Sequence, residues 1–574
     1  MNQIKASVSE RKTTLDAIRQ KGRVSVLIVG AGINGAGLFR DLAAQGVDVL
    51  LVDKGDFCCG ASAAPSRMIH GGLRYLEFGE FRLVRESVTE RNLLLKNAGH
   101  YVNPLPTTIP IFSWFSGAMS SMLRFFRLSV GRPAHRGAAM VKAGLTFYDI
   151  YTRKTSSMPK HTFTSRAKSL AERPLLNPGL INTATYYDAW ISYPERLCLE
   201  LLMDGEESHE GATAVNYVSL DGHSGDAVSL KDELSGETFD VKPDVLINAT
   251  GAWIDFANQR LGKETKLIGG TKGAHLVIDN DEVMNTLRGH MIYFETDDGR
   301  VAVVLPWMGK VLAGSTDIRV DDPDKVRCED DEIDYILESM HQVFPTIKVD
   351  RSQIVSVFSG VRPLRHSDAS ATVQVSRDHL CDVIEPDGLS FPVYSLVGGK
   401  WTTFRAFAQQ VTDRLMEHFN RARRTGTEEM AIGGGKDFPK EVDARAKWIA
   451  AANEKTGLSE ERLEVLLDRY GTRAEQVAAF CTEQPDRPLE HHATYTAREI
   501  EFIVVREGVM HLDDLLLRRT AIALLGELSG ELLAELVAIV GPLLQWSDEE
   551  AKKEVERTID VLDDRHNVEV TYPG

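Results

Sequence analysis

A glycine-rich turn between two apolar segments is the feature that most constrains this fold. Residues 24–29 (VSVLIV) are continuously apolar and lead into GAGINGAG, which is followed by the amphipathic segment LFRDLAAQG and a second apolar run. The change of hydrophobic period, punctuated by glycines, predicts a strand, a turn, a helix and a second strand. Residues 24–53 therefore predict a βαβ unit.

Three glycines of this turn, Gly30, Gly32 and Gly35, form the pattern GxGxxG, and Asp53 ends the second apolar run. The first glycine allows a tight turn, the second lets the backbone approach a pyrophosphate, and the third lets the helix pack closely on the strand. The helix N-terminus adds oriented N–H groups and a positive dipole. A carboxylate at the place of Asp53 accepts hydrogen bonds from ribose hydroxyls. The pattern predicts a dinucleotide site; the alternative is a glycine-rich turn beside a solvated aspartate.

FAD fits the remaining sequence better than a nicotinamide cofactor. The sequence contains one such fingerprint, whereas a flavin enzyme that takes electrons from a nicotinamide would usually need two. A further apolar strand, DVLINATGAW (244–253), ends in Ala249, Thr250 and Gly251, a small-residue turn suited to a backbone that passes close to a cofactor. We therefore expect one tightly held FAD.

Charge and cysteine content exclude several classes of function. The 574 residues include 83 acidic and 66 basic side chains, which gives a formal net charge of −17 at pH 7. Nucleic-acid binding needs a basic face, so no nucleic acid is expected as a partner. The six cysteines are scattered, which argues against a disulfide framework and against a metal site. The first 22 residues are polar and lack the apolar segment of a signal peptide, so we expect a cytoplasmic protein.

Hydrophobic periodicity divides the chain into two regions. Strand-like segments recur through the first 430 or so residues, whereas helical patterns dominate after about residue 436. The junction is predicted near the three glycines at 433–435 and Pro439. The predicted strands after the βαβ unit are 212–220, 225–230, 237–248, 274–278, 301–305, 311–314 and 353–357.

Eight further motifs occur in a fixed order along the chain. They are HGGLRYLEFGEFRLVRESVTERNLLLKNAGH (70–100), YYDAW (186–190), INATGAW (247–253), KGAHLVI (272–278), LPWMGKVLAGSTD (305–317), FSGVRPL (358–364), SRDH (376–379) and GGKWTTFRAFA (398–408). With the fingerprint before them, they closely resemble the FAD-dependent glycerol-3-phosphate dehydrogenase family. The helical segment 499–520 is similar to the family's C-terminal domain, so the resemblance covers about residues 22 to 560.

The resemblance implies an α/β fold of three parts. A glutathione-reductase-like FAD domain of Rossmann type is interleaved with a substrate domain built on an antiparallel sheet, and a helical domain follows. The body is expected at 22–430, with FAD-binding segments at about 22–110, 210–265 and 355–420, and the helical domain at 436–565.

The activity implied by the resemblance is oxidation of sn-glycerol 3-phosphate to dihydroxyacetone phosphate. Electrons pass from FAD to a membrane quinone or, in an oxidase branch, to oxygen. The implied partners are a small anionic phosphorylated polyol and a quinone, and a homodimer is compatible with the resemblance.

Hydride transfer from a secondary alcohol to a flavin needs a clamp for the distal anion and a group that takes the hydroxyl proton. Arginine suits the clamp because its guanidinium is planar, bidentate and permanently charged. The candidates are Arg74, Arg362, Arg377 and Lys400, with Tyr75 nearby; the alternative for each basic residue is a structural ion pair. His275 is the candidate base, because imidazole can accept a proton near neutral pH, and the alternative is a packed core histidine. His275, Arg362 and Lys400 form the predicted catalytic set.

Further residues are expected to contact the flavin. Glycine pairs let backbone approach a cofactor, and Thr402 and Thr403 open an apparent helix whose N–H groups could face the flavin's pyrimidine end. These predicted cofactor residues are Lys54, Ser62, Ser66, His70, Gly71, Gly72, Ala249, Thr250, Gly251, Gly398, Gly399, Thr402 and Thr403.

Two stretches depart from the family's pattern and keep the substrate open. The family usually reads TSSRSSKLIHGG where this chain has ASAAPSRMIHGG (61–72), and it commonly has an aspartate pair before ARL where this chain has ISYPERL (191–197). Another phosphorylated polyol, such as erythritol 4-phosphate, is therefore an alternative substrate. An amine or amino-acid oxidase of the same architecture is a further alternative.

Residues 115–160 carry charge opposite to that of the whole chain. They contain eight basic residues and one acid, interleaved with apolar and aromatic side chains. A basic amphipathic stretch of this kind is typical of attachment to an anionic membrane surface. We expect peripheral attachment to the inner face of the cytoplasmic membrane; the alternative is a solvated face packed against the protein's own body.

Overall fold

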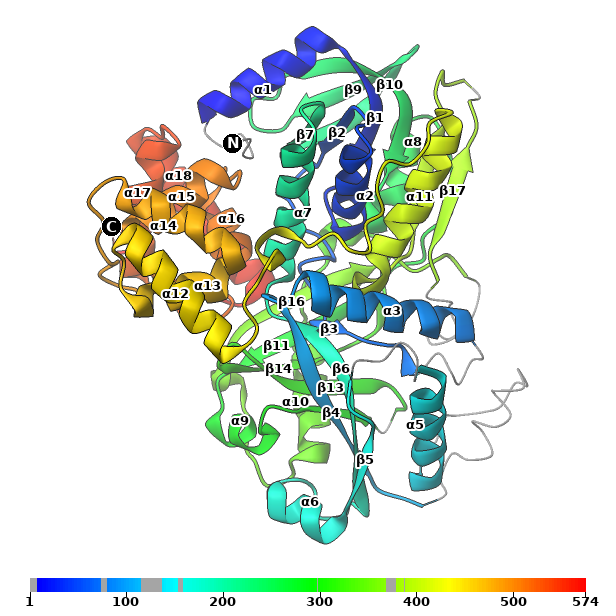
Figure 1. The fold of residues 1–574 in the computed structure, drawn as a ribbon, viewed down its shortest axis with the longest axis vertical. Helices are drawn as coiled ribbons and strands as arrows, with labels where there is room; N and C mark the ends of the chain where they lie inside the picture. The colour runs from blue at the N-terminus through cyan, green and yellow to red at the C-terminus, as the bar shows by residue number, and fades with distance from the viewer. Residues whose placement is uncertain are drawn as a thin grey trace.

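Two β-sheets and a group of C-terminal helices build the fold in this computed structural model (Figure 1). The structure describes residues 8–73, 80–114, 137–152, 158–296, 298–367, 378–386 and 388–573. The α/β class, the two kinds of sheet and the C-terminal helical domain confirm the predicted fold class.

The first sheet contains the predicted βαβ unit. Strand β1 (Arg23–Val29) pairs in parallel with β2 (Val49–Val52), and α2 (Ile33–Ala44) connects them. The strand order is β17-β18-β10-β1-β2-β7, with the β8–β9 hairpin pairing antiparallel to the first half of β10. The remaining strands are β7 (Ala212–Val215), β8 (Val218–Ser224), β9 (Ala227–Asp232), β10 (Thr238–Asn248), β17 (Leu380–Ile384) and β18 (Val393–Val397).

Alternate residues of β1 enter two different cores, as expected for a sheet covered on both faces. Val26 and Ile28 pack in the core with helices α2, α7 (Pro194–Ser208) and α11 (Phe404–His418). Leu27 and Val29 pack on the opposite face with α1 (Val8–Lys21) and the β8–β9 hairpin. This explains why β1 reads as a continuous apolar run.

The second sheet is mostly antiparallel and has ten strands. Its order is β15-β11-β14-β13-β12-β4-β6-β3, with β16 on the other edge of β11 and β5 beside β6. Among the described strands of this sheet, only β12 and β4 pair in parallel. The strands are β3 (Met68–Ile69), β4 (Val102–Ile111), β5 (Thr162–Ser165), β6 (Asn182–Ile191), β11 (Thr271–Ile278), β12 (Met291–Glu295), β13 (Val301–Trp307), β14 (Lys310–Gly314), β15 (Ile318–Arg319) and β16 (Ile354–Arg362). The helices around it are α3 (Phe81–Asn97), α5 (Ala138–Thr152), α6 (Arg166–Glu172), α9 (Asp281–Leu287) and α10 (Asp330–Val343).

The segments assigned to FAD binding contribute to both sheets. Strands β3 and β4, within 22–110, and β16, within 355–420, pair in the second sheet instead of the first. The reason is that the chain crosses between the sheets within these two segments: 22–110 begins in the first sheet and ends in the second, and 355–420 begins in the second and ends in the first. Strands β7 to β10, within 210–265, do belong to the first sheet.

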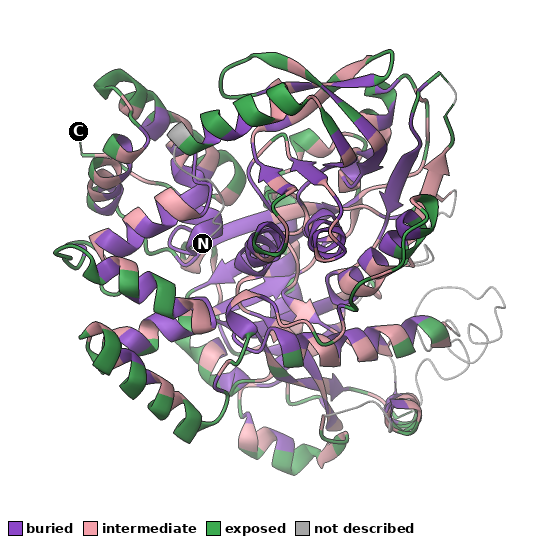
Figure 2. Cartoon of the chain, turned by 45° about the horizontal axis from the view of Figure 1, so that its top comes forward, coloured by how far each residue is buried: buried purple, intermediate pink, exposed green. Residues whose placement is uncertain are grey.

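The C-terminal helices share a core with the second sheet. Leu305, Trp307 and Leu312 of that sheet pack in one cluster with Leu515 and Leu516 of the helical domain. Buried residues therefore continue from the sheets into this domain (Figure 2). The helices are α8 (Ile254–Arg260) in the body, then α12 (Val442–Thr456), α13 (Glu460–Tyr470), α14 (Ala474–Thr482), α15 (Ala497–Arg506), α16 (Leu512–Asp514), η9 (Leu515–Arg519, a π-helix), α17 (Gly530–Leu543) and α18 (Asp548–His566). The short 3-10 helices are η2 (Gly251–Trp253), η3 (Pro323–Lys325), η4 (Arg351–Gln353), η6 (Trp401–Thr403), η7 (Gly433–Gly435) and η8 (Gly471–Arg473).

Candidate active site

One cavity of about 1440 Å³ lies where the carboxyl ends of the parallel strands meet the second sheet. Strands β1, β2, β10 and β18 run parallel, so the turns that follow them lie at one edge of the first sheet. This edge is where ligands bind in open α/β sheets. Predicted residues that line the cavity are Gly30, Gly32, Asp53, Lys54, Ser62, Ser66, His70, Ala249, Thr250, Gly251, His275, Arg362, Gly398, Gly399, Lys400 and Thr402.

The fingerprint turn is packed tightly at two of its glycines. A Cβ on Gly35 would lie 1.9 Å from the carbonyl oxygen of Gly30, so this residue sets the close approach of α2 to β1. Gly30 has φ +110°, and a Cβ there would lie 2.6 Å from the carbonyl oxygen of Ala249 at the end of β10. The Ser62 hydroxyl accepts a hydrogen bond from the Ile33 N–H at 3.0 Å. The N-terminus of α2 thus faces the cavity, as a pyrophosphate site requires.

Backbone N–H groups hold the Asp53 side chain at the carboxyl end of β2. Its Oδ2 accepts from the Ala31 N–H at 2.6 Å and its Oδ1 from the Gly55 N–H at 3.0 Å. Burial raises the pKa of the Asp53 carboxyl to about 6, although the two N–H donors oppose this shift. Because burial disfavours its charge, the carboxylate would be stabilised by any further hydrogen-bond donor, such as the ribose hydroxyl that the fingerprint predicts. The Lys54 ammonium instead pairs with Asp324 at 2.8 Å.

The turn after β10 is held by Asn248, a residue that sequence reasoning missed. Its side-chain amide donates to the Ile254 carbonyl at 2.9 Å, and its Oδ1 accepts from the Thr250 hydroxyl at 2.6 Å. Its amide also donates to the Asn258 side chain at 2.8 Å, and its Oδ1 also accepts from the Thr250 N–H at 3.3 Å, so these contacts together fix the small-residue turn against the cavity. The only signal in the sequence is an asparagine between the apolar strand and that turn.

The cavity wall carries polar atoms that fit a bound dinucleotide. Asn34 donates to the Gly398 carbonyl at 3.1 Å, whereas its buried Oδ1 has no hydrogen-bond partner among the described residues. A Cβ on Gly399, whose φ is +91°, would lie 2.7 Å from the Asn34 Nδ2. A buried acceptor without a partner is costly unless a ligand supplies the donor. The residues present therefore fit FAD, and Asn34 is a candidate contact that the sequence did not reveal.

His275 lies on β11 in the wall of this cavity. Its Nε2 is 2.7 Å from the Ser66 hydroxyl, and its ring stacks on Phe358 with a centroid distance of 5.1 Å. The ring is buried, and its Nδ1 has no hydrogen-bond partner among the described residues. Burial, followed by the positive charges of Arg362 and Arg67, lowers the pKa of His275 to about 3. The imidazole is therefore neutral at physiological pH, and it is a weaker base than a free imidazole.

Arg362 ends β16 and reaches across the neighbouring strand β11. Its Nη2 donates to the Ser315 hydroxyl at 2.9 Å and its Nη1 to Asp317 at 3.4 Å. Space for the guanidinium comes from Gly273, where a Cβ would lie 2.0 Å from the Arg362 Nη2. Lys400 lies before η6 and donates to the Ser87 hydroxyl at 3.3 Å. The structure thus brings two cationic side chains and one neutral imidazole to the same cavity.

Some predicted residues lie elsewhere. Gly71 does not line the cavity: its N–H donates to Asp188 at 2.8 Å, and a Cβ would lie 1.8 Å from the Tyr148 hydroxyl. Packing against α5 is thus what demands a glycine there. Gly35, Gly72 and Thr403 are not among the lining residues either. Arg74, Tyr75 and Arg377 lie outside the described residues, as do most of the basic side chains of 115–160.

The two stretches that depart from the family's pattern contact each other. Arg67, from ASAAPSR, donates to Glu195, from ISYPERL, at 3.1 Å, and both side chains are buried. The Arg67 guanidinium also donates to the Ser192 carbonyl at 2.9 Å and stacks over the Trp307 ring at 4.1 Å. The departures therefore form one compensated ion pair at the cavity, which Glu195 lines, and neither stretch alone reveals this pairing.

Comparison with known proteins agrees with this geometry. The profile of the FAD dependent oxidoreductase family matches residues 25–414, and that of the C-terminal domain of alpha-glycerophosphate oxidase matches residues 425–551. The chain is 32% identical to a glycerol-3-phosphate dehydrogenase of Synechocystis sp. over 94% of this chain and 96% of the relative. It is 29% identical to the aerobic glycerol-3-phosphate dehydrogenase of Escherichia coli over 86% of this chain and 93% of the relative.

A solved structure shares the fold over its whole length. The glycerol-3-phosphate dehydrogenase of Bacillus halodurans complexed with FAD superposes with a TM-score of 0.74 and 21% identity, covering 97% of this chain and 98% of that one. Both the body and the C-terminal helices therefore have counterparts in a flavoprotein fold.

Proposed function

Because the chain belongs to the family of FAD-dependent glycerol-3-phosphate dehydrogenases, we propose that it oxidises sn-glycerol 3-phosphate to dihydroxyacetone phosphate. The observation that carries the proposal is the meeting of His275 and Arg362 in the cavity that also holds the fingerprint turn. The substrate needs an anion clamp and a proton acceptor close to the cofactor, and these two side chains supply them.

The side chains have separate roles in this proposal. Arg362 binds the phosphate through its guanidinium fork, and Lys400 adds a second positive charge on the same cavity. His275 takes the proton from the hydroxyl of the substrate, and the Ser66 hydroxyl holds its Nε2 in place. FAD, when bound, accepts the hydride from the carbinol carbon. Arg74, Tyr75 and Arg377 stay predicted substrate contacts.

Substrate binding would raise the basicity of His275. The charge of Arg362 is one cause of the low pKa of His275, after burial. A phosphate dianion on Arg362 neutralises that charge, so the imidazole accepts a proton more readily once the substrate is in place. The base is thus stronger in the complex than in the free enzyme.

Anaerobic reduction of the bound flavin tests the proposal. The purified holoenzyme is mixed with glycerol 3-phosphate, erythritol 4-phosphate or glycine, and the visible flavin band is followed. We expect glycerol 3-phosphate to bleach the band at the lowest concentration. Bleaching by glycine, with no response to either phosphate, would assign the chain to the amine oxidases instead.

A second polyol phosphate is favoured by one observation. Ala63, Ala64 and Pro65 line the cavity in place of the family's hydroxyl or basic side chains. Smaller apolar side chains leave room for a longer polyol and offer it fewer hydrogen bonds. Faster bleaching by erythritol 4-phosphate than by glycerol 3-phosphate in the same experiment would establish this alternative.

Quinone at an anionic membrane is the acceptor that we propose. Support comes from four exposed apolar side chains that flank residues 115–136, namely Phe112, Trp114, Phe147 and Ile150; the last is 68% exposed. Phe147 and Ile150 lie three residues apart on α5, hence on one face. No helix in the described part of the chain is long and apolar enough to cross a bilayer. The exposed apolar side chains support peripheral attachment, which we propose to be to the inner face of the cytoplasmic membrane.

Liposome co-sedimentation and acceptor assays test this attachment. Ile150→Glu should weaken binding to vesicles that contain anionic lipid, whereas Val442→Glu, at an apolar position on α12 that is even more exposed, should not. The bleached enzyme should be reoxidised faster by a short-chain quinone than by oxygen. Equal binding of the two variants would contradict the attachment, and faster reoxidation by oxygen would place the chain in the oxidase branch.

A further inference from the structure

The C-terminal helical domain supplies part of the wall of the cofactor cavity. Asp513, Leu517 and Arg518 line it beside the loop that follows β2, and Arg557 of α18 lines it as well. The body alone therefore does not enclose the end of the cavity at which Asp53 lies.

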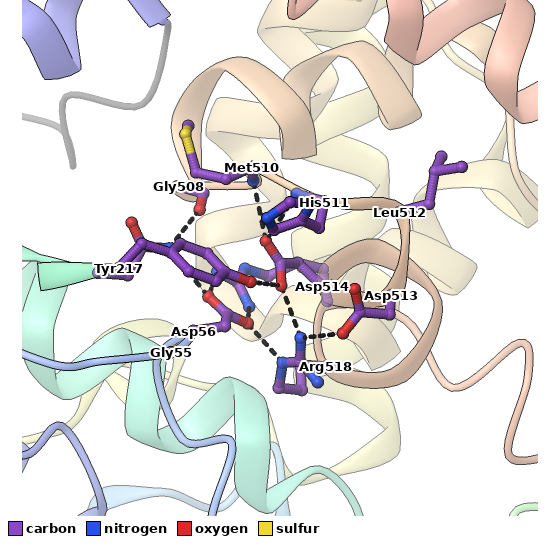
Figure 3. Close-up of polar contacts among 12 residues, drawn as sticks. Gly55, Asp56, Tyr217, Gly508, Met510, His511, Leu512, Asp513, Asp514 and Arg518 are labelled. Carbon is purple, nitrogen blue, oxygen red and sulfur yellow. Dashed lines mark hydrogen bonds and ion pairs between the residues drawn. The ribbon is translucent and has the colours of Figure 1, made fainter. Parts of the chain in front are cut away.

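Asp56 ties this wall to the body. Its fully buried carboxylate accepts from the Arg518 Nε at 2.5 Å and from two nitrogens of Arg519 at 2.7 Å each. Figure 3 shows Asp56 and Arg518 facing each other across the boundary between the two parts of the chain. Both guanidiniums come from the π-helix η9, a helix type found often at functional sites.

Residues of the body and of the C-terminal domain both form hydrogen bonds around the Asp56–Arg518 ion pair. Arg518 also donates to Asp513 at 2.9 Å and to Asp514 at 2.6 Å. The Tyr217 hydroxyl, from the loop after β7, donates to Asp514 at 2.6 Å (Figure 3). The loops after two strands of the first sheet, β2 and β7, therefore both hold the C-terminal domain.

The same loop after β2 carries the ribose carboxylate. Asp53 accepts from the Gly55 N–H at 3.0 Å, and Asp56 is the next residue along the chain. A buried carboxylate bound by two guanidiniums cannot shift without exposing uncompensated charge, so it fixes the position of the loop. The backbone of 53–56 is thus anchored at one end by β2 and at the other by the C-terminal domain.

We propose that Asp56, Arg518 and Arg519 are positioning residues for FAD: docking of the C-terminal domain sets the loop 53–56 for the ribose, and FAD binding in turn stabilises that docking. The inference rests on the assignment of FAD to this cavity and not on the identity of the substrate. Thermodynamic linkage requires the two effects to be equal, so whatever docking adds to FAD affinity, FAD adds to docking.

Two measurements on the full chain test the coupling. FAD affinity is measured by quenching of flavin fluorescence on the apoprotein, for wild type, Asp56→Asn and Arg473→Gln. Arg473 is a matched control, because it joins the C-terminal domain to Asp204 and Glu207 of α7 without lining the cavity. We expect Asp56→Asn to raise the Kd at least about tenfold and Arg473→Gln to leave it within about twofold.

Hydrogen exchange of wild type supplies the second measurement and needs no variant. FAD should slow amide exchange in residues 508–519, which hold Arg518 and Arg519 but lie in the other domain. Tyr217→Phe removes one hydrogen bond and leaves no buried charge without a counter-charge. It should weaken both FAD affinity and this protection, but less than Asp56→Asn does.

Each outcome separates the coupling from the proposed reaction. Unchanged FAD affinity in Asp56→Asn, or exchange in 508–519 that does not respond to FAD, overturns the inference whatever substrate bleaches the flavin. FAD binding with the expected coupling but no bleaching by a polyol phosphate leaves the inference standing and overturns the proposed reaction.

Discussion

Gly273→Ala tests whether the placement of the Arg362 guanidinium governs catalysis. The added Cβ would lie 2.0 Å from Nη2, 2.4 Å from Cζ and 2.5 Å from Nη1 of Arg362. Ordinary contact begins near 3.4 Å, so the guanidinium must retreat by more than 1 Å, on the order of a carbon–carbon bond length. The atoms that it meets belong to the end of a flexible side chain, so strand β11 can keep its place.

The expected loss is kinetic and not structural. Misplacement of a positioning group by about 1 Å costs on the order of 100-fold in rate, which corresponds to about 2.7 kcal/mol of transition-state stabilisation. We expect kcat/KM for glycerol 3-phosphate to fall by about this factor in steady-state assays. The free energy of unfolding should change by no more than about 1 kcal/mol, because no backbone contact is lost.

Two further variants complete this test. Gly222→Ala, on β8, is the matched control, because its Cβ would meet nothing closer than the Arg260 carbonyl at 3.8 Å. Arg362→Ala should abolish the effect of a second Gly273→Ala substitution, since both act through one guanidinium. If Gly273→Ala kept kcat/KM within twofold of wild type, or if the two losses added, Arg362 would not be the anion clamp.

Three other changes have defined outcomes. Glu195→Gln should lower the free energy of unfolding by about 3–5 kcal/mol in urea titration, because Arg67 stays buried without its counter-charge, and an unchanged midpoint would show that the pair is inert. The pKa of His275 falls from 6.5 to about 3 on folding, so the unfolded chain binds a proton that the folded chain does not, and stability is lost as pH falls below 6.5. His275→Gln should therefore lose about 2 kcal/mol less than wild type between pH 7.5 and 5, a difference that parallel urea titrations would reveal or refute. Gly35→Ala should yield protein with little flavin, judged by the ratio of flavin to protein absorbance, because its Cβ would collide with backbone; normal flavin content would contradict the packing described.

Local chemistry explains how much of the fold the sequence predicts. The βαβ unit was predictable because its strand is apolar on both faces and because Gly35 packs on the carbonyl oxygen of Gly30, five residues earlier in the chain. Strand β4 was missed because its prolines remove backbone donors, which argues against a sheet interior. In the structure, β12 pairs with β4 at Thr107 and Thr108, so Pro104 and Pro106 lie beyond that pairing.

The site residues also differ in whether a short stretch of sequence is enough to identify them. His275 and Arg362 are recognisable because each lies in a short motif, and the antiparallel pairing of β11 with β16 brings them to one cavity. Arg518 meets Asp56 across 462 positions of sequence, and a glutamate meets Arg67 across 128. Such contacts depend on the packing of whole domains, which a pattern of residue types does not encode.

The C-terminal wall of the cavity also sets the order in which the cofactor can be acquired during synthesis. Domains begin to fold from the N-terminus as a chain leaves the ribosome. A nascent chain that has emerged to about residue 430 already carries the fingerprint turn, Arg362 and Lys400, yet it lacks Arg518 and Arg557, which line the cavity. The guanidinium partners of Asp56, Arg518 and Arg519, have not emerged at that stage either. Loading of FAD into the completed cavity is therefore an event of the released or nearly released polypeptide, and a truncated product would hold an open, weakly binding precursor of the site.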